Sequence, residues 1–145
     1  MKLIRWGLKG AEKPGLVDKA GALRDLSGQI GDFTPDQLSP DGLKRLAAID
    51  TSGLPKVPEG ARLGVPFNGI SKIVCVGLNY ADHAAETGAK IPKEPILFLK
   101  AVSSLNGPND DIVIPRGAVK TDWEVELGVV IGTRTSYVNE QDALS

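Results

Sequence analysis

The stretch Thr121-Asp-Trp-Glu-Val-Glu-Leu-Gly-Val-Val-Ile131 decides how this sequence is interpreted. Its large apolar residues alternate with Glu124 and Glu126. This pattern predicts a β-strand with both carboxylates on one face, their Cα atoms roughly 6.5–7 Å apart. Two like charges on an otherwise apolar strand resist desolvation. Either this face is solvated, as in many antiparallel strands, or a hard cation such as Mg²⁺ compensates the charge.

The composition resembles that of an ordinary soluble protein. The chain has 145 residues, of which 41% are hydrophobic and 24% are charged. The net charge of −1 argues against nucleic acid as a partner. No apolar stretch approaches the roughly 20 residues of a membrane span, and the N-terminus lacks the apolar region of a signal peptide. Cys75 cannot form an intrachain disulfide because it is the single cysteine, so we expect a cytoplasmic protein.

The first part of the chain predicts a small α+β module over residues 1–66. The 17 glycines and 10 prolines indicate many turns and short strands, so the expected fold class is α+β and β-rich. We expect a strand over 2–6 and a hairpin over 15–26. Ser39-Pro40-Asp41 predicts the start of a helix that ends near 50–53, after a turn or short helix at 34–36. Residues 51–69 are rich in proline and glycine and predict an extended linker.

The second part, residues 67–145, predicts a further set of short elements. A β-branched run over 72–77 indicates a buried strand that also buries Cys75. Asn79, paired with Asp82, is expected to cap a short helix that Gly88 ends near residue 86 or 87. Further strands are expected at 95–100, 111–115 and 123–131, with a turn at 107–110, and residues 139–145 indicate the first turn of another helix.

His83 is the only histidine, and it lies three residues before Glu86. On a helix, residues at this spacing are neighbours. A carboxylate beside an imidazole orients its tautomer, which is the arrangement that a water-activating base needs. A solvated helix face with one histidine and two acids remains the alternative. Lys100 ends an apolar strand, where it either meets an anionic substrate or extends to solvent.

Three ordered blocks, 76–86, 95–100 and 122–132, resemble the fumarylacetoacetate hydrolase family. The resemblance implies a mixed β-roll, here its N-terminal part, preceded by the small module of the longer bacterial members. It also implies a homodimer and a Mg²⁺ or Mn²⁺ site. Carried onto this chain, it makes Glu124 and Glu126 metal ligands, His83 and Glu86 the water-activating pair, and Tyr80 and Lys100 residues near the substrate.

The resemblance implies a metal-dependent hydrolase that cleaves a C–C bond in a 2-oxo acid, of the acylpyruvate or 2,4-diketo-3-deoxy-sugar-acid type. The metal would stabilise the enolate that leaves. Ureidoglycolate lyase and hydroxymuconate isomerase activities are alternatives within the family. The family's third metal carboxylate belongs to a later block than this sequence contains, and neither Glu140 nor Asp142 matches it. We therefore expect the N-terminal half of a longer enzyme. A non-enzymatic fragment is the alternative from another class.

Overall fold

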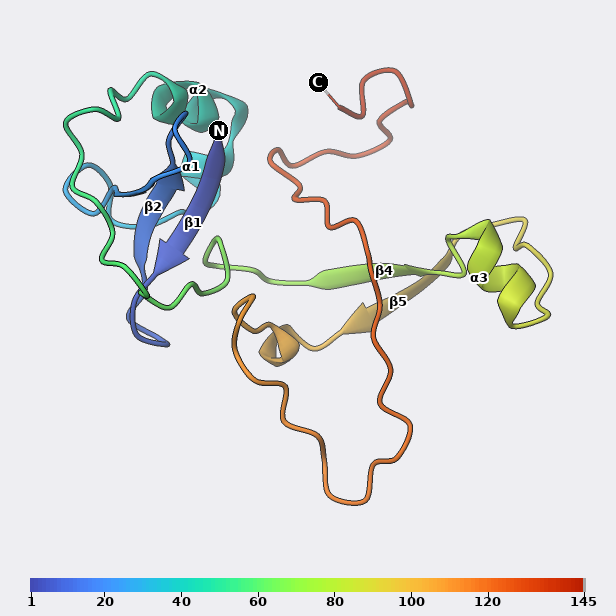
Figure 1. Cartoon of the computed structure of the whole chain (residues 1–145). Helices are drawn as coiled ribbons and strands as arrows, with labels where there is room; N and C mark the ends of the chain where they lie inside the picture. Colours follow the sequence, from blue (N-terminus) through green and yellow to red (C-terminus); the bar gives the residue numbers. More distant parts are fainter. Residues whose placement is uncertain (145) are drawn as a thin grey trace.

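Three short antiparallel strands at the start of the chain form its larger sheet (Figure 1). The structure is a computed structural model that describes residues 1–144. Strand β1 (Lys2–Trp6) pairs with β2 (Lys13–Val17), which pairs with β3 (Leu23–Asp25). The turn between β2 and β3 is closed by the Asp18 amide, which donates to Ala22 O at 2.9 Å. The predicted first strand and hairpin are both confirmed.

Two helices follow the sheet, and their starts agree with the sequence prediction. Helix α1 (Pro35–Leu38) is short, and α2 (Pro40–Ala47) begins after Ser39. The Ser39 Oγ accepts a hydrogen bond from the Gly42 amide at 3.1 Å, as expected of an N-cap hydroxyl. Helix α2 ends at Ala47, slightly before the predicted region.

The hydrophobic core lies between the sheet and these helices. Partly buried residues surround it, including Leu3 on β1 and Phe67 after the helices. The buried members of this core are Leu16, Leu26, Phe33, Leu46 and Leu54. The core therefore belongs to the first part of the chain, which we call the N-terminal module (residues 1–66). The division into 1–66 and 67–145 stays a prediction.

Residues 51–69 form no helix or named strand, but the expectation of an extended linker was wrong in part, because turns form at 51–54 and 58–61 and the segment is bound to the sheet. The Val57 amide donates to Leu23 O at 3.0 Å, which joins this segment to β3. Leu63 forms an antiparallel bridge with Trp6 and joins the segment to β1. The prolines did not prevent these contacts, because proline is tolerated at the edge of a sheet, where its missing N–H faces outward.

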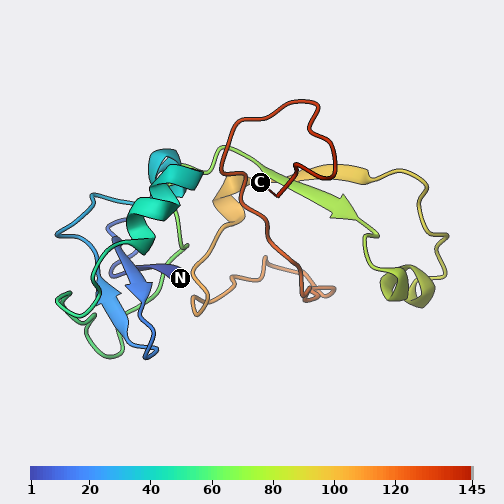
Figure 2. The ribbon, with the colours of Figure 1, turned by 90° about the horizontal axis from the view of Figure 1, so that it is seen from above.

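A second, two-stranded sheet extends away from the N-terminal module (Figures 1 and 2). Strand β4 (Ile73–Gly77) pairs antiparallel with β5 (Ile96–Lys100), so both predicted strands are confirmed. Helix α3 (Ala81–Glu86) lies between them in sequence, and a 3-10 turn η1 (Val102–Ser104) follows β5. The expectation that β4 is buried was wrong: Val74 and Val76 are exposed and Cys75 is half-buried. Two paired strands cannot cover both of their own faces.

No helix or strand forms within residues 105–144. The predicted strands at 111–115 and 123–131 are wrong for this structure, and residues 139–143 form turns rather than a helix. Ser145, the last residue of that predicted helix, lies outside the described residues. Alternating apolar and polar residues favour a β-strand, but a strand also needs a neighbouring strand for its backbone hydrogen bonds.

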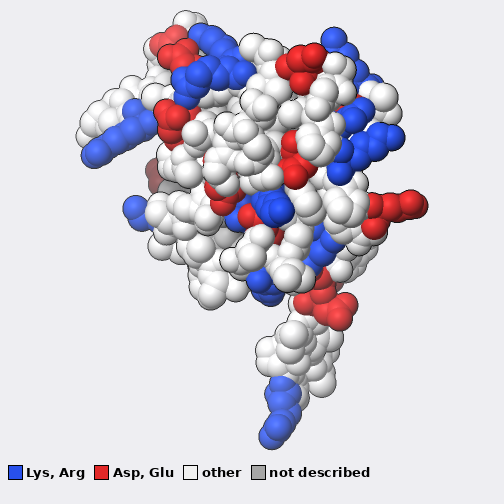
Figure 3. Space-filling model, turned by 90° about the vertical axis from the view of Figure 1, so that its left-hand side faces the viewer, with Lys and Arg blue, Asp and Glu red and all other residues white. Residues whose placement is uncertain are grey.

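The surface carries both signs of charge. Figure 3 shows lysine and arginine side chains interspersed with acidic ones over the face that it draws. Over residues 1–144, none of the helices has the length and apolar character that crossing a membrane requires.

Candidate functional site

Helix α3 brings together the histidine and the carboxylate that the sequence paired. His83 Nδ1 lies 4.0 Å from Glu86 Oε2, and the two side chains are 58% and 83% exposed. This distance is beyond that of a hydrogen bond. The pair is thus a loose contact on an open helix face, and a change of rotamer in either exposed side chain can close it.

Backbone geometry around α3 explains its position. Leu78 has φ 48°, a left-handed conformation that is uncommon for leucine, and it turns the chain from β4 into the helix. Tyr80 is the N-cap residue, so the prediction that Asn79 and Asp82 cap the helix was wrong. Asp82 instead accepts a hydrogen bond from the amide of His83 at 2.9 Å. Gly88, with φ 67°, follows the C-cap as predicted.

Ala84 anchors α3, and Tyr80 lies at its start. The Ala84 side chain is buried, and its carbonyl accepts a hydrogen bond from the Ala89 amide at 2.8 Å. Tyr80 is partly exposed, with its ring in the same short segment as His83 and Glu86. The substrate-contact role of Tyr80 stays a prediction.

Lys100 and Glu124 form an ion pair that the sequence did not predict. Lys100 Nζ donates to Glu124 Oε2 at 3.0 Å, and the side chains are 46% and 63% exposed. The hydrogen bond that Lys100 donates to Glu124, together with the negative charge of Glu124, raises the pKa of Lys100. The opposite charges of the two residues are the feature of the sequence that could have indicated this pair. Local sequence rules do not predict contacts between residues 24 positions apart.

The strand expected to present Glu124 and Glu126 is absent, so their common face is absent as well. Trp123, Val125 and Leu127 are strongly exposed in this extended segment. The two glutamates are candidate metal ligands by residue type, but one already contacts an ammonium group. Within residues 1–144, no group of three or more histidine, cysteine, aspartate or glutamate side chains is placed to hold a metal ion.

This donor set does not fit Mg²⁺ or Mn²⁺ as it stands. Mg²⁺ requires near-octahedral oxygen coordination, which two carboxylates cannot complete without further ligands. The ammonium group of Lys100 beside Glu124 also compensates the charge that a cation would otherwise neutralise.

The predicted site residues fall into two groups at opposite ends of the β4–β5 sheet. Gly77 pairs with Ile96 at the end that leads into α3, whereas Ile73 pairs with Lys100 at the other end. Four residue steps of about 3.4 Å separate the two ends, roughly 14 Å. The His83–Glu86 pair and the Lys100–Glu124 pair are therefore not brought into one site by residues 1–144. Figure 1 shows α3 at the outer end of this sheet.

The chain is similar to known proteins of one hydrolase family. Residues 72–145 match the family described as "Fumarylacetoacetate (FAA) hydrolase C-terminal". A protein of Burkholderia orbicola (strain MC0-3) named "Putative hydrolase" is 55% identical over 144 residues, which are 99% of this chain and 51% of that protein. A protein of Burkholderia ambifaria with the same name has the same identity and coverage. The chain therefore spans about half the length of the curated relatives it matches.

The chain is also similar to a solved structure. A crystal structure described as that of "a putative HpcE protein" from Mycobacterium smegmatis has a TM-score of 0.57 and 30% sequence identity. The match covers 79% of this chain and 41% of the other. It supports the mixed α and β architecture described above.

Proposed function

Because the chain belongs to the fumarylacetoacetate hydrolase family, we propose that it contributes about half of a hydrolase that cleaves a C–C bond in a 2-oxo acid. The acylpyruvate or 2,4-diketo-3-deoxy-sugar-acid class is the proposed substrate. The family and the hydrolase names of its relatives support hydrolase or lyase activity as a general class. A homodimer in the cytoplasm is part of the same proposal.

The observation that carries this proposal is the His83–Glu86 pair on α3. With Nδ1–H turned toward the Glu86 carboxylate, the other ring nitrogen, Nε2, keeps a free lone pair. The 4.0 Å gap must shorten by about 1 Å for Glu86 to accept a hydrogen bond. Exposed side chains can make that adjustment when a substrate covers the helix, and catalytic hydrogen bonds often tighten on binding.

In the proposed step, Nε2 of His83 takes a proton from a water molecule as the water oxygen attacks the carbonyl carbon farther from the carboxylate. The bond between that carbon and the next one toward the carboxylate then breaks. Its electron pair stays on the 2-oxo acid fragment as an enolate. His83, protonated in the first half of the step, can return the proton to the enolate carbon. Glu86 stabilises the imidazolium in the interval.

A requirement for Mg²⁺ or Mn²⁺ is also proposed, but Glu124 and Glu126 alone do not supply it. Further oxygen ligands must come from polypeptide equivalent to the half of the relatives that this chain does not match. The Lys100–Glu124 contact would have to open for Glu124 to act as a ligand. Lys100 would then be free to bind the carboxylate of the substrate.

The test is acylpyruvate turnover by a protein of the relatives' length, with Mg²⁺ present. His83→Ala should lower kcat by about 10²–10⁴-fold, the usual contribution of a positioned base. Glu86→Gln should lower it less, because Glu86 acts on the imidazole of His83 and not on the water or the substrate. Glu94→Gln is the matched control, since Glu94 is another exposed carboxylate of the same segment. Its turnover should equal that of the parent protein.

Three outcomes would contradict parts of the proposal. An unchanged rate in His83→Ala removes the base, and turnover that survives complete chelation removes the metal. Sub-millimolar Mg²⁺ binding by the 145-residue chain alone, measured by calorimetry, would contradict the need for further ligands. Product identification separates hydrolysis from the lyase and isomerase reactions of related chemistry. We expect no turnover from the 145-residue chain by itself.

A further inference from the structure

Arg62 lies between two carboxylates that come from different parts of the chain. Its Nε and Nη2 atoms donate to both oxygens of Asp110, at 2.7 and 2.6 Å. Its Nη1 atom donates to Glu12 Oε1 at 2.9 Å. Glu12 belongs to the N-terminal module and Asp110 to the segment that matches the family. The guanidinium therefore spans the two parts, and a two-pronged contact of this kind fixes orientation as well as distance.

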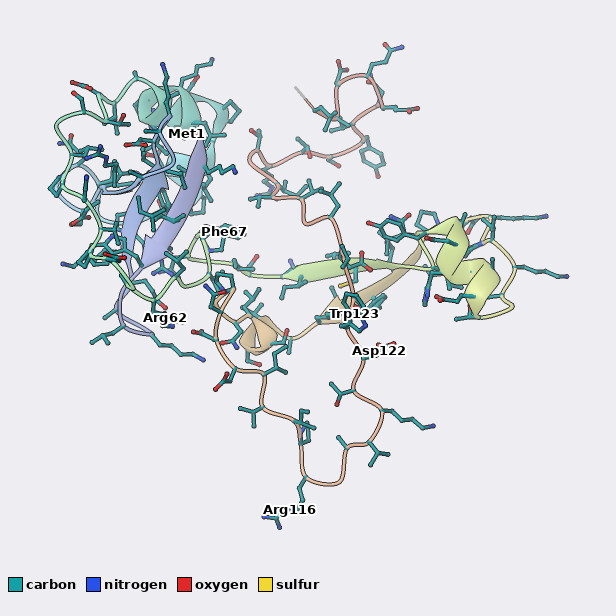
Figure 4. The ribbon with its side chains drawn as sticks, viewed as in Figure 1. Met1, Arg62, Phe67, Arg116, Asp122 and Trp123 are labelled. Carbon is teal, nitrogen blue, oxygen red and sulfur yellow. The ribbon has the colours of Figure 1, made fainter. Side chains whose placement is uncertain are left out.

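The backbone of Arg62 is held against β1, which aims its side chain. The Gly7 amide donates to Arg62 O at 2.9 Å, and the Gly64 amide donates to Arg5 O at 2.8 Å. Figure 4 shows Arg62 at the edge of the N-terminal module, and Phe67 where the chain leaves it for β4. Arg62 is thus a fixed point of the sheet edge rather than part of a mobile connection.

The facing loop, residues 105–111, is shaped to receive this side chain. The Gly107 amide donates to Asp110 Oδ2 at 3.0 Å, and the Asp110 amide donates to Gly107 O at 3.2 Å. A Cβ on Gly107 would collide with the carbonyl oxygen of Leu63, so only glycine permits this approach. The loop and the module are therefore in close backbone contact, beyond the ion pair itself.

Further charges continue the row into the module. Arg5 donates to both oxygens of Asp32, at 2.8 and 2.9 Å, and lies 3.7 Å from Glu12. Negative and positive groups therefore alternate, in the order Asp32, Arg5, Glu12, Arg62 and Asp110. Beside this row, a cavity of about 260 Å³ is lined from both parts, by Arg5 and Val65 of the module and by Val102 and Leu105 of the second part.

Burial distinguishes this row from surface ion pairs. The side chains of Arg62, Glu12 and Asp110 are 26%, 9% and 14% exposed. Those of Arg45 and Asp36, which also form an ion pair at 3.0 Å, are 60% and 71% exposed. Exposed pairs contribute little because water and salt screen them. Removing one partner of a sheltered pair costs more, because it leaves the other charge without compensation.

We propose that the N-terminal module is a docking surface for loop 105–111 of the same chain, and that Arg62 is the residue that holds the two together. The module then holds in place the loop that follows β5 and η1. This role does not depend on the proposed catalytic activity. It assigns Arg62 and Asp110 to positioning rather than to chemistry.

The test measures the distance between the two parts in the 145-residue chain. Spin labels are placed at Lys19→Cys, on the exposed turn after β2, and at Ser103→Cys in η1, in a Cys75→Ser background. Double electron–electron resonance should give one narrow distance for this parent chain. Arg62→Gln should cause the loss of that single distance and a broad distribution instead. Arg45→Gln, which removes an exposed pair, should leave the narrow distance unchanged.

Asp110→Asn is a second variant that tests the same contact, in case Arg62→Gln unfolds the module. Asp110 lies outside the hydrophobic core, so its substitution should release the loop while the β1–β2 amides stay protected from exchange. A broad distribution in Asp110→Asn with a protected sheet supports the proposal. A single narrow distance in Asp110→Asn, or in a folded Arg62→Gln, overturns it.

Discussion

Gly42 lies in helix α2, where replacing glycine by alanine should destabilise the protein rather than stabilise it. Alanine is normally favoured over glycine inside a helix by about 1 kcal/mol. In α2, however, a Cβ on Gly42 would collide with the carbonyl oxygen of Asp36 in α1 and with the backbone of Gln37. Gly42→Ala should therefore destabilise the chain, by about 1–3 kcal/mol, the usual cost of overpacking. Urea unfolding measures the difference.

Gly53→Ala provides the matched control for this prediction. A Cβ on Gly53 meets nothing within 4 Å, and its φ is not in the left-handed region. Its unfolding midpoint should stay near that of the parent, within about 0.5 kcal/mol. Equal stability of Gly42→Ala and the parent would mean that α1 and α2 separate easily.

Residue spacing predicted the His83–Glu86 pair but not the Lys100–Glu124 pair. His83 and Glu86 are neighbours because the helix repeat places positions three apart on one face. Lys100 and Glu124 meet only because segments distant in sequence approach each other in the fold. A lysine and a glutamate have no spacing rule that would have indicated this contact.

Among the elements, the β4–β5 sheet should be the least protected of the paired strands. It has two strands only, and several of its apolar side chains are exposed, whereas β2 lies against the core. A two-stranded sheet is marginal in water without packing on one face. We expect amides of β4 and β5 to exchange with solvent at least about tenfold faster than those of β2, because local opening costs less where few contacts are buried.

Hydrogen exchange followed by NMR spectroscopy measures this difference in the 145-residue chain. The β1–β2 ladder serves as the internal reference, because it has the same antiparallel pairing but lies over the core. Equal protection of the two sheets would show that β4 and β5 are covered in solution, for example by residues 123–131 or by a second copy of the chain.

Residues 123–131 have the residue pattern of a β-strand but do not form one in this structure. Their alternation suits a strand with one apolar face, yet Trp123, Val125 and Leu127 are exposed and the segment is not paired within residues 1–144. A helix satisfies its backbone within one segment, whereas a strand needs a second one. Helix α2 therefore formed as predicted and this strand did not.

For the whole molecule, the partly buried, paired carboxylates predict a loss of stability in acid. The hydrogen bond from Arg24 lowers the pKa of Asp18, and that from Arg62 lowers the pKa of Asp110. Burial raises the pKa of Glu12, but the hydrogen bond from Arg62, the backbone hydrogen bonds and the Arg5 charge together outweigh it, so this pKa is lowered as well.

A carboxyl group with a lowered pKa in the folded state stabilises the fold only while it is ionised. Its contribution is complete above the pKa of the unfolded chain, about 3.9 for Asp and 4.3 for Glu. It is lost as the pH falls through the lower pKa of the folded state. The urea midpoint should thus change little from these groups between about pH 7 and pH 5, and fall below about pH 4.

Urea titrations at a series of pH values measure this acid limb. Asp18→Asn should flatten it, because the Arg24 contact then no longer depends on ionisation. Asp41→Asn is the control, since the ion pair of Asp41 with Lys44 is exposed to solvent. An acid limb of the same steepness in Asp18→Asn and the parent would contradict the assignment.

The sequence by itself determined the features that depend on residues a few positions apart. It predicted β1, the β2–β3 hairpin, the Ser39 cap of α2, the Gly88 end of α3 and the His83–Glu86 pair. These rest on caps, turn conformations and helix spacing, which are set by neighbouring residues. The blocks that resemble the family also lie in the sequence alone, and the comparisons confirmed the family.

Only the tertiary structure decided which distant segments meet. It joined residues 55–64 to the sheet edges, placed Arg62 against Asp110 across 48 positions, and kept the two groups of candidate site residues at opposite ends of β4 and β5. No local pattern specifies such contacts, because ion pairs and sheet edges are chosen by whichever partners the whole chain brings within reach. The alternation around Glu124 and Glu126 therefore indicated what that segment could become, and the fold determined that within residues 1–144 it has no strand to pair with.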